Sequence, residues 1–247
     1  MEPVTAVVPA YPEPPWDYLN ASILNLVVRV GQPEHLSRFL APGVEAQEGR
    51  DTVLFTFLDV PNIPQMGLDY HSSECGLVIP VRTQGEVRGG HFAFMLVDND
   101  TALAAGREIW GYPKKLAQVR MRRTSDDTIT ARALHHPYRE WNAAGALQAR
   151  VRLDGSSDGL WDEARAFEPR ILSRTVRSPE SGRPEGSTLL AVEAKVVRVH
   201  ERASGSATLE IGGSREEGLV LLGPFEVLGA LYTRCDFVLD YGTPVRG

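Results

Sequence analysis

Short runs in which apolar and polar residues alternate recur along the chain, and they predict a structure built mainly of β-strands. The clearest runs span residues 23–30, 52–60, 74–82 and 87–97. Alternation combined with β-branched or aromatic residues is typical of strands, and Gln84-Gly85 between the last two runs predicts a hairpin. The run 52–60 carries apolar residues at both odd and even positions, so we expect a central strand that is buried on both faces.

The later part of the chain continues in the same way with shorter runs. Strands are predicted at 116–123, 128–135, 147–153, 170–176, 188–200, 207–211 and 236–241, and helical spacing is found at 33–40, 101–110, 161–167 and 225–235. Many short strands with few helices favour a mainly β (α+β) fold, which we expect to be a single antiparallel β-barrel-like domain with appended helices over residues 19–247. Residues 1–18 contain five prolines and predict an extended N-terminal arm.

Composition narrows the class of protein. The net charge is −6 without a long basic run, which argues against nucleic acid as a partner. No run approaches the roughly 18 apolar residues of a membrane span, and two distant cysteines, Cys75 and Cys235, fit a cytoplasmic protein without a disulfide framework. Glycine-rich phosphate loops are absent from the sequence. His135-His136 lacks further ligands at suitable spacing, so we expect no metal.

Two adjacent lysines, Lys114 and Lys115, are the strongest candidates for chemistry. The chain has only three lysines against 23 arginines. Arginine stays charged in proteins, whereas a lysine can become a neutral, nucleophilic amine through burial or a neighbouring cation. Gly111 and Pro113 are expected to end the preceding helix, which places the pair at the start of a strand. The pair therefore indicates amine chemistry, with a solvated surface turn as the alternative.

The segment Gly106 to Ala117, Gly-Arg-Glu-Ile-Trp-Gly-Tyr-Pro-Lys-Lys-Leu-Ala, resembles the signature of the acetoacetate decarboxylase family. Residues 74–81 and 95–100 also resemble strands of that family, and the likeness is strong over 20–123 and faint beyond. The resemblance implies a lyase that decarboxylates a β-keto acid through a Schiff base on an active-site lysine. It also implies a homo-oligomer that needs no metal or organic cofactor.

Carried over by position, the resemblance makes Lys114 the Schiff-base lysine and Lys115 the neighbour that favours its neutral form. Glu74 becomes the active-site acid, with an exposed strand-edge glutamate as the alternative. Three further residues are candidates for substrate binding: Met95, Tyr112 and Arg107. The first two fit equally well as plain core residues, and Arg107 fits equally well as a structural residue at the helix end.

Two departures from the family pattern leave the substrate open. Family decarboxylases carry an arginine just before the first strand and a glutamate on the second, where this chain has Ala21 and Thr56. Without that polar pair, aldolase or dehydratase chemistry on another oxo acid, through the same lysine, is the first alternative. A non-catalytic barrel that binds an apolar ligand is the second.

Overall fold

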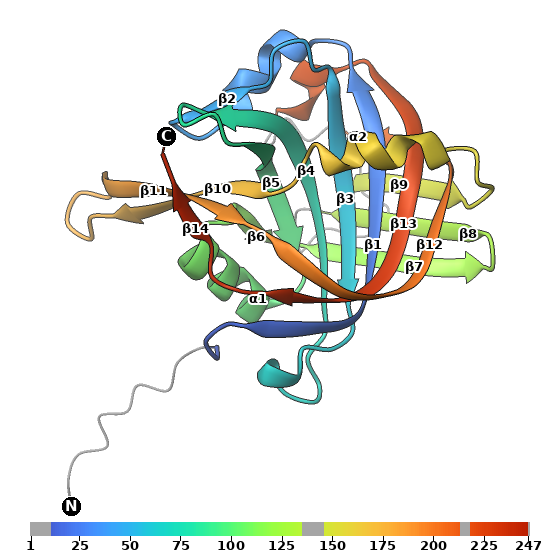
Figure 1. The fold of residues 1–247 in the computed structure, drawn as a ribbon, viewed down its shortest axis with the longest axis horizontal. Coiled ribbons are helices and arrows are strands. Elements are labelled where there is room, and N and C mark those ends of the chain that lie inside the picture. The colour runs from blue at the N-terminus through green and yellow to red at the C-terminus, as the bar shows by residue number, and fades with distance from the viewer. Residues whose placement is uncertain (1–10, 135–145, 213–217, 247) are drawn as a thin grey trace, which may run out of the picture.

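The computed structural model describes residues 11–134, 146–212 and 218–246, and β-strands dominate it (Figure 1). The strands are β1 Trp16–Val30, β2 Val44–Ala46, β3 Thr52–Val60, β4 Ser72–Thr83, β5 Arg88–Val97, β6 Lys114–Leu116, β7 Gln118–Ser125, β8 Thr128–Leu134, β9 Ala146–Arg152, β10 Arg170–Arg177, β11 Pro184–Val192, β12 Ala194–Ile211, β13 Phe225–Leu239 and β14 Thr243–Val245. The predicted predominance of strands is confirmed.

Helical segments are short. Two are α-helical, α1 Asp100–Ala105 and α2 Trp161–Arg165, and η3 Gly106–Trp110 continues α1 as a π-helix. The 3₁₀ segments are η1 Pro33–Phe39, η2 Pro64–Met66, η4 Asp158–Leu160 and η5 Leu219–Leu222. Among the described residues, no helix is long and apolar enough to cross a bilayer.

The strands form one sheet in the order β14-β11-β10-β5-β4-β3-β1-β13-β12-β9-β8-β7, with β2 beside β4 and β6 beside β5. Pairing is antiparallel except where β5 meets β6 and β10. The order does not return on itself, so the sheet is not closed and the barrel is not confirmed. β3 lies between β1 and β4, as its apolar residues on both faces predicted.

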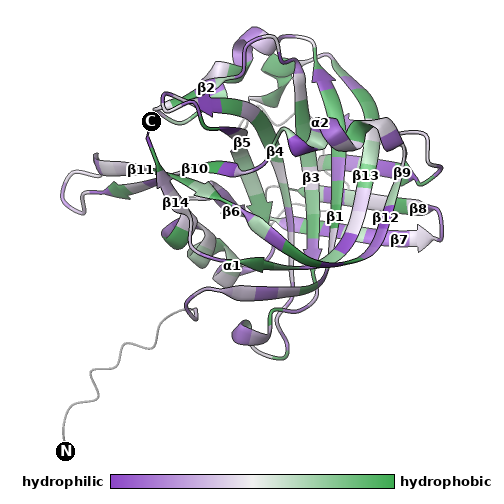
Figure 2. Ribbon diagram, viewed as in Figure 1, coloured by the Kyte–Doolittle hydropathy of each residue, from purple (hydrophilic) through white to green (hydrophobic). Residues whose placement is uncertain are grey.

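Two hydrophobic cores cover the two faces of the central strands. The first lies between these strands and β7, β8 and β9, which cross behind them in Figure 1, and it contains Phe57, Leu77 and Val151. The second contains Trp16, Met95 and other residues of the opposite face. Figure 2 shows hydrophobic residues concentrated on β1, β3, β4 and β5, which fits their burial on both sides.

The helix predicted at 225–235 is wrong, because this segment belongs to β13, which pairs with both β1 and β12. Its apolar residues were read at helical spacing, yet they also serve the two faces of a buried strand. Leu231 faces one core and Tyr232 the other. Where both faces are covered, long-range pairing decides between helix and strand. Similarly, the single strand predicted at 188–200 is divided between β11 and β12.

The N-terminal arm is described only in part. Residues 1–10 lie outside the described residues, and β1 already begins at Trp16. Tyr11 donates a hydrogen bond to Glu108 at 2.5 Å and packs edge-on against Trp16, with 6.4 Å between ring centroids. Through these contacts the described part of the arm lies against the end of η3.

Candidate active site

A cavity of about 130 Å³ opens within the second hydrophobic core. Segments far apart in the sequence form its walls. Trp16 comes from β1, Phe92 and Met95 from β5, and Leu239 from β13. Ligand pockets of this kind combine apolar walls with a few placed polar groups, and here the polar groups include Lys114 and Glu74. The cavity is therefore the natural candidate for an active site.

A capped helix and a glycine turn position the segment that precedes Lys114. Helix α1 begins after Asn99, whose side chain accepts a hydrogen bond from the Ala102 amide at 2.9 Å. The helical segment ends at Gly111, which has φ of 83°, and a Cβ there would lie 2.5 Å from the Ser173 carbonyl oxygen. Glycine meets both demands, so the predicted helix end is confirmed.

After this turn the chain joins β5 in parallel, and Lys114 is the register partner of Met95. The Met95 amide donates to the Pro113 carbonyl at 3.3 Å. Because successive side chains of a strand point to opposite sides, Lys114 enters the cavity, whereas Lys115 is exposed on the other side. The structure thus separates the environments of the two lysines.

Lys114 and Glu74 form a buried ion pair. Lys114 Nζ donates to Glu74 Oε1 at 2.8 Å, and the two side chains are 7% and 6% exposed. The predicted alternative of an exposed strand-edge glutamate is therefore wrong. Two charges removed from water are costly unless they are closely paired, so this arrangement keeps an amine and a carboxylate in contact inside an apolar cavity.

An aromatic ring lies beside the amine and packs against two others. Lys114 Nζ lies 5.4 Å from the centroid of the Tyr112 ring, within the range of a cation–π contact. The Tyr112 ring packs edge-on against Phe92 at 5.5 Å and Trp110 at 6.2 Å. Burial raises the pKa of the Tyr112 phenol well above its ordinary value, an effect that the charge of Arg170 opposes. The phenol is therefore neutral and can donate a hydrogen bond.

The other predicted site residues divide into two groups. Met95 and Tyr112 line the cavity, as does Thr56, which stands at the expected glutamate position. Arg107 is exposed and donates to the carbonyl of Lys114 at 3.2 Å, so it contacts the backbone at Lys114 and is not among the residues that line the cavity. Ala21 is fully buried in the second core.

Several cavity residues were not predicted from the sequence. Trp16, Phe92, Glu168 and Arg170 all line it. No local motif marks Glu168 and Arg170, which flank a proline where the chain enters β10. A single parallel bridge between Arg170 and Gly90 brings them beside β5. Only the apolar character of the surrounding segments was visible in the sequence.

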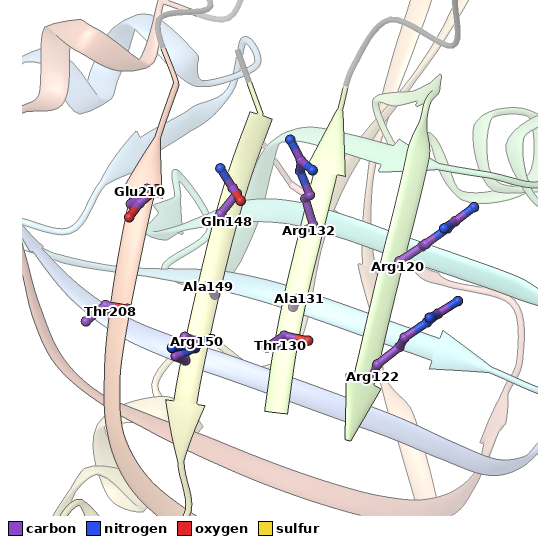
Figure 3. Close-up of a pocket in the computed structure, with 10 residues that line it drawn as sticks. All are labelled: Arg120, Arg122, Thr130, Ala131, Arg132, Gln148, Ala149, Arg150, Thr208 and Glu210. Atoms are coloured by element: carbon purple, nitrogen blue, oxygen red, sulfur yellow. The ribbon is translucent and has the colours of Figure 1, made fainter. Parts of the chain in front are cut away.

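A second hollow lies on the outer face of β7, β8, β9 and β12 (Figure 3). Arg120 and Arg132 are register partners in one row, and Arg122, Thr130 and Arg150 are partners in the next. The described residues that line this hollow include no lysine and a single acid, Glu210. It therefore lacks the amine–carboxylate pair that distinguishes the cavity in the second core.

Metal ligands do not gather within the described parts of the chain. No group of three or more His, Cys, Asp or Glu residues there could hold a metal ion. The histidines considered from the sequence, His135 and His136, lie outside the described residues. The cavity itself presents an amine, carboxylates and phenol groups, from Lys114, Glu74 and Tyr112 among others.

Comparison with known proteins identifies relatives of this chain along nearly its whole length. The family model described as acetoacetate decarboxylase (ADC) matches residues 3–247. The chain is 30% identical to acetoacetate decarboxylase of Chromobacterium violaceum, covering 96% of this chain and 91% of the relative. It is 34% identical to acetoacetate decarboxylase 1 of Bradyrhizobium diazoefficiens, covering 95% and 88%.

Solved structures show the same fold. The structure of acetoacetate decarboxylase from Legionella pneumophila superposes with a TM-score of 0.79 at 23% identity, covering 96% of this chain and 89% of that one. The enduracididine biosynthesis enzyme MppR complexed with pyruvate superposes with a TM-score of 0.73 at 16% identity, covering 94% and 91%. The chain belongs to the acetoacetate decarboxylase family.

Proposed function

We propose that this protein decarboxylates a small β-keto acid through a Schiff base on Lys114. The observation that carries the proposal is the buried contact between Lys114 Nζ and Glu74 Oε1 at 2.8 Å. It places an amine that can form a Schiff base beside a group that can accept its proton, within a cavity whose size suits a short oxo acid. Family membership supports a keto acid as the substrate.

The reaction follows from these groups. A proton passes from Lys114 Nζ to Glu74, and the neutral amine attacks the keto carbon to give a carbinolamine, which loses water to form an iminium ion. The bond between the carboxylate and the α-carbon then breaks, CO₂ leaves, and the electron pair moves to the iminium nitrogen to give an enamine. Protonation of the α-carbon restores the iminium ion, and water releases the ketone and the amine.

The cavity walls favour decarboxylation, because this step converts a charged carboxylate into neutral CO₂. Apolar side chains such as Met95, Phe92 and Leu239 solvate a carboxylate poorly, whereas CO₂ is neutral. Glu74 can return its proton to the α-carbon of the enamine or balance the charge of the iminium ion. Trp16 Nε1 is buried and has no hydrogen-bond partner among the described residues, so we expect it to donate to a substrate oxygen.

Lys115 takes a supporting role in this proposal. Its positive charge follows Lys114 directly in the chain and disfavours a second ammonium group nearby. Because Lys115 is exposed, solvent screens this effect. Burial of Lys114 is accordingly the larger influence on the reactivity of the amine. Homo-oligomeric assembly and a cytoplasmic location stay predictions from the sequence.

Aldolase or dehydratase chemistry at the same lysine is a second candidate. It is favoured by Ala21 and Thr56, which replace the arginine and glutamate expected in a decarboxylase. Two structures with the same fold point in that direction, since MppR is described in complexes with pyruvate and with the condensation product of pyruvate and imidazole 4-carboxaldehyde. Either reaction begins with an iminium ion on Lys114.

Borohydride trapping tests the proposal. The protein is incubated with acetoacetate, and separately with pyruvate, before borohydride is added and Lys114 is examined by peptide mass mapping. An isopropyl group on Lys114 after acetoacetate means that CO₂ left before reduction and supports the decarboxylase. A carboxyethyl group after pyruvate, without an isopropyl group after acetoacetate, supports the second candidate.

Controls make the outcome specific. Lys114→Met removes the amine while keeping an unbranched side chain, and it should abolish the adduct, whereas Lys195→Met changes a lysine that does not line the cavity and should not. An adduct that persists in Lys114→Met would move the chemistry elsewhere. Absence of an adduct with either acid would contradict both reactions and favour a ligand-binding protein.

A further inference from the structure

A second ion pair lines the same cavity. The Arg170 guanidinium lies 2.9 Å from Glu168 Oε1 and donates to the Phe167 carbonyl at 2.5 Å. Its carbon Cζ also lies 5.6 Å from the centroid of the Phe92 ring. The Arg170 side chain is only 14% exposed, so a mostly buried cation stands in the cavity in addition to Lys114.

The two members of this pair differ in exposure. Glu168 is 48% exposed, in contrast to the 14% of Arg170. A half-exposed carboxylate can rotate into the solvent at little cost in free energy. A buried guanidinium that is left without an anion is strongly destabilised. Arg170 has five N–H donors in a planar fork suited to carboxylates, and its contacts with Phe167 and Glu168 occupy only some of them. An incoming carboxylate can therefore replace Glu168 on the fork.

The guanidinium and the Lys114 amine lie at different places along the cavity. Arg170 contacts the Phe92 ring, Phe92 packs on Tyr112, and Tyr112 in turn contacts Lys114 Nζ. The phenol of Tyr112 responds to both sides of this row, since Arg170 lowers its pKa while Glu74 raises it. The cation at Arg170 and the amine that would hold the keto carbon thus contact neighbouring aromatic rings of one cavity.

We propose that Arg170 binds a second carboxylate of the substrate, distal to the keto carbon, so that the preferred substrate is a short oxo diacid. This inference rests on the proposed Schiff base at Lys114. The carboxylate that leaves would lie beside Lys114 and Glu74, whereas a second carboxylate on the other side of the keto carbon would extend toward Arg170. In the free protein Glu168 pairs with the Arg170 guanidinium, and the second carboxylate of the diacid replaces Glu168 there on binding.

The volume of the cavity limits the length of that diacid. A water molecule takes up about 30 Å³ of liquid, so 130 Å³ corresponds to about four waters and suits a chain of about four or five carbons. The positive charge at Arg170 also bears on the departures at Ala21 and Thr56. The cavity contains an arginine, but β10 supplies it, whereas the position of Ala21 lies on β1.

A matched pair of acids tests the inference. Acetoacetate and 3-oxoglutarate are the same β-keto acid without and with a second carboxylate. The readout is the concentration of each acid that gives half-maximal borohydride trapping at Lys114. We expect the diacid to need a concentration at least about tenfold lower than the monoacid, because a hydrogen-bonded charge pair supplies that discrimination.

Two variants and one control test whether Arg170 and Glu168 cause the preference for the diacid. Arg170→Gln should abolish most of the preference for the diacid, and Glu168→Gln should increase it because the competing carboxylate is gone. Arg122→Gln removes an arginine from the outer face of β7 (Figure 3) and should leave the preference unchanged. Circular dichroism and thermal melting show whether each variant folds, and Glu168→Gln decides the question if Arg170→Gln does not.

Equal half-saturation of the wild-type protein by both acids would overturn the inference, as would an equal loss for both acids in Arg170→Gln. An unchanged preference in Glu168→Gln would likewise contradict the exchange of carboxylates. These failures differ from failure of the proposed function, in which neither acid is trapped at Lys114. Trapping of acetoacetate alone would keep the Schiff base and exclude the diacid.

Discussion

Lys114 and Glu74 meet across three adjacent strands of one sheet. Glu74 lies on β4, Lys114 lies on β6, and β5 pairs with both. The resulting distance of 2.8 Å between Nζ and Oε1 is thus set by backbone pairing on both sides. Because both side chains are nearly buried, each is the main partner that balances the other's charge.

Glu74→Gln is expected to weaken both folding and reaction. It leaves the Lys114 ammonium buried without an anion, which should lower the free energy of unfolding by about 3 kcal/mol. Loss of a proton acceptor should lower kcat/KM by about 100-fold. Urea denaturation and steady-state kinetics measure the two effects.

The double variant Lys114→Met/Glu74→Gln provides the control for stability. Since it removes both charges, it should be more stable than the sum of the two single changes implies. Simple additivity of the three unfolding free energies would contradict the ion pair.

Gly106→Ala is expected to harm activity more than stability. A Cβ at Gly106 would lie 2.7 Å from Lys114 Cδ and 2.8 Å from Cε, so the lysine side chain must shift. The helical backbone at Gly106, with φ of −60°, accepts alanine readily. We predict a loss of at least about tenfold in kcat/KM, with a smaller loss of stability than in Glu74→Gln because the amine and the carboxylate both remain.

Gly159→Ala is the matched control, because nothing lies within 4 Å of the added Cβ. It should leave kinetics unchanged. Full activity in Gly106→Ala would mean that the position of Nζ tolerates displacement, and the proposed geometry would then lose its support.

Lys115→Gln is expected to reduce the rate of borohydride trapping by less than about tenfold, because its exposed charge acts on Lys114 through solvent. The loss should shrink as ionic strength rises, since salt screens exposed charges. Trapping rates in low and high salt measure this. A loss as large as that of Lys114→Met would assign Lys115 a direct part in the reaction.

Burial of His91 predicts that the protein loses part of its folding stability in acid. Burial lowers its pKa below the ordinary value of 6.5, against the opposing hydrogen bond between Nδ1 and the Ile171 carbonyl. As pH falls below 6.5, His91 binds a proton more readily in the unfolded chain than in the folded protein, so the free energy of unfolding falls. The slope from this residue is at most about 1.4 kcal/mol per pH unit.

His91→Asn keeps an N–H donor near Nδ1 but does not titrate. Urea denaturation from about pH 5 to pH 7.5 should therefore show a shallower loss of stability in the variant than in the wild type. Parallel curves would show that His91 is protonated equally in the folded and unfolded states.

Short sequence patterns predicted the parts of the site that are formed by residues close together in the chain. The hairpin of β4 and β5 follows from two alternating runs and a tight turn, and the helix end at Gly111 follows from a residue that tolerates positive φ. Together these features account for the placement of Glu74 and Lys114 on neighbouring strands.

Other parts depend on pairing that no short window contains. Arg170 reaches the cavity through one bridge to Gly90, and β13 is a strand because β1 and β12 enclose it. Apolar spacing alone also cannot decide whether a long sheet closes, which is why the barrel was expected and an open strand order was found. In each case distant partners outweigh local preference.

The pairing of Trp16 with Leu239 has a consequence for how the protein is made. These two residues are register partners of β1 and β13, and both line the cavity. Contacts between residues so distant in sequence form late, because the intervening chain must first be ordered. During synthesis the cavity therefore lacks a wall until β13 has left the ribosome, so a nascent chain that already contains Lys114 and Glu74 has only an incomplete cavity around them.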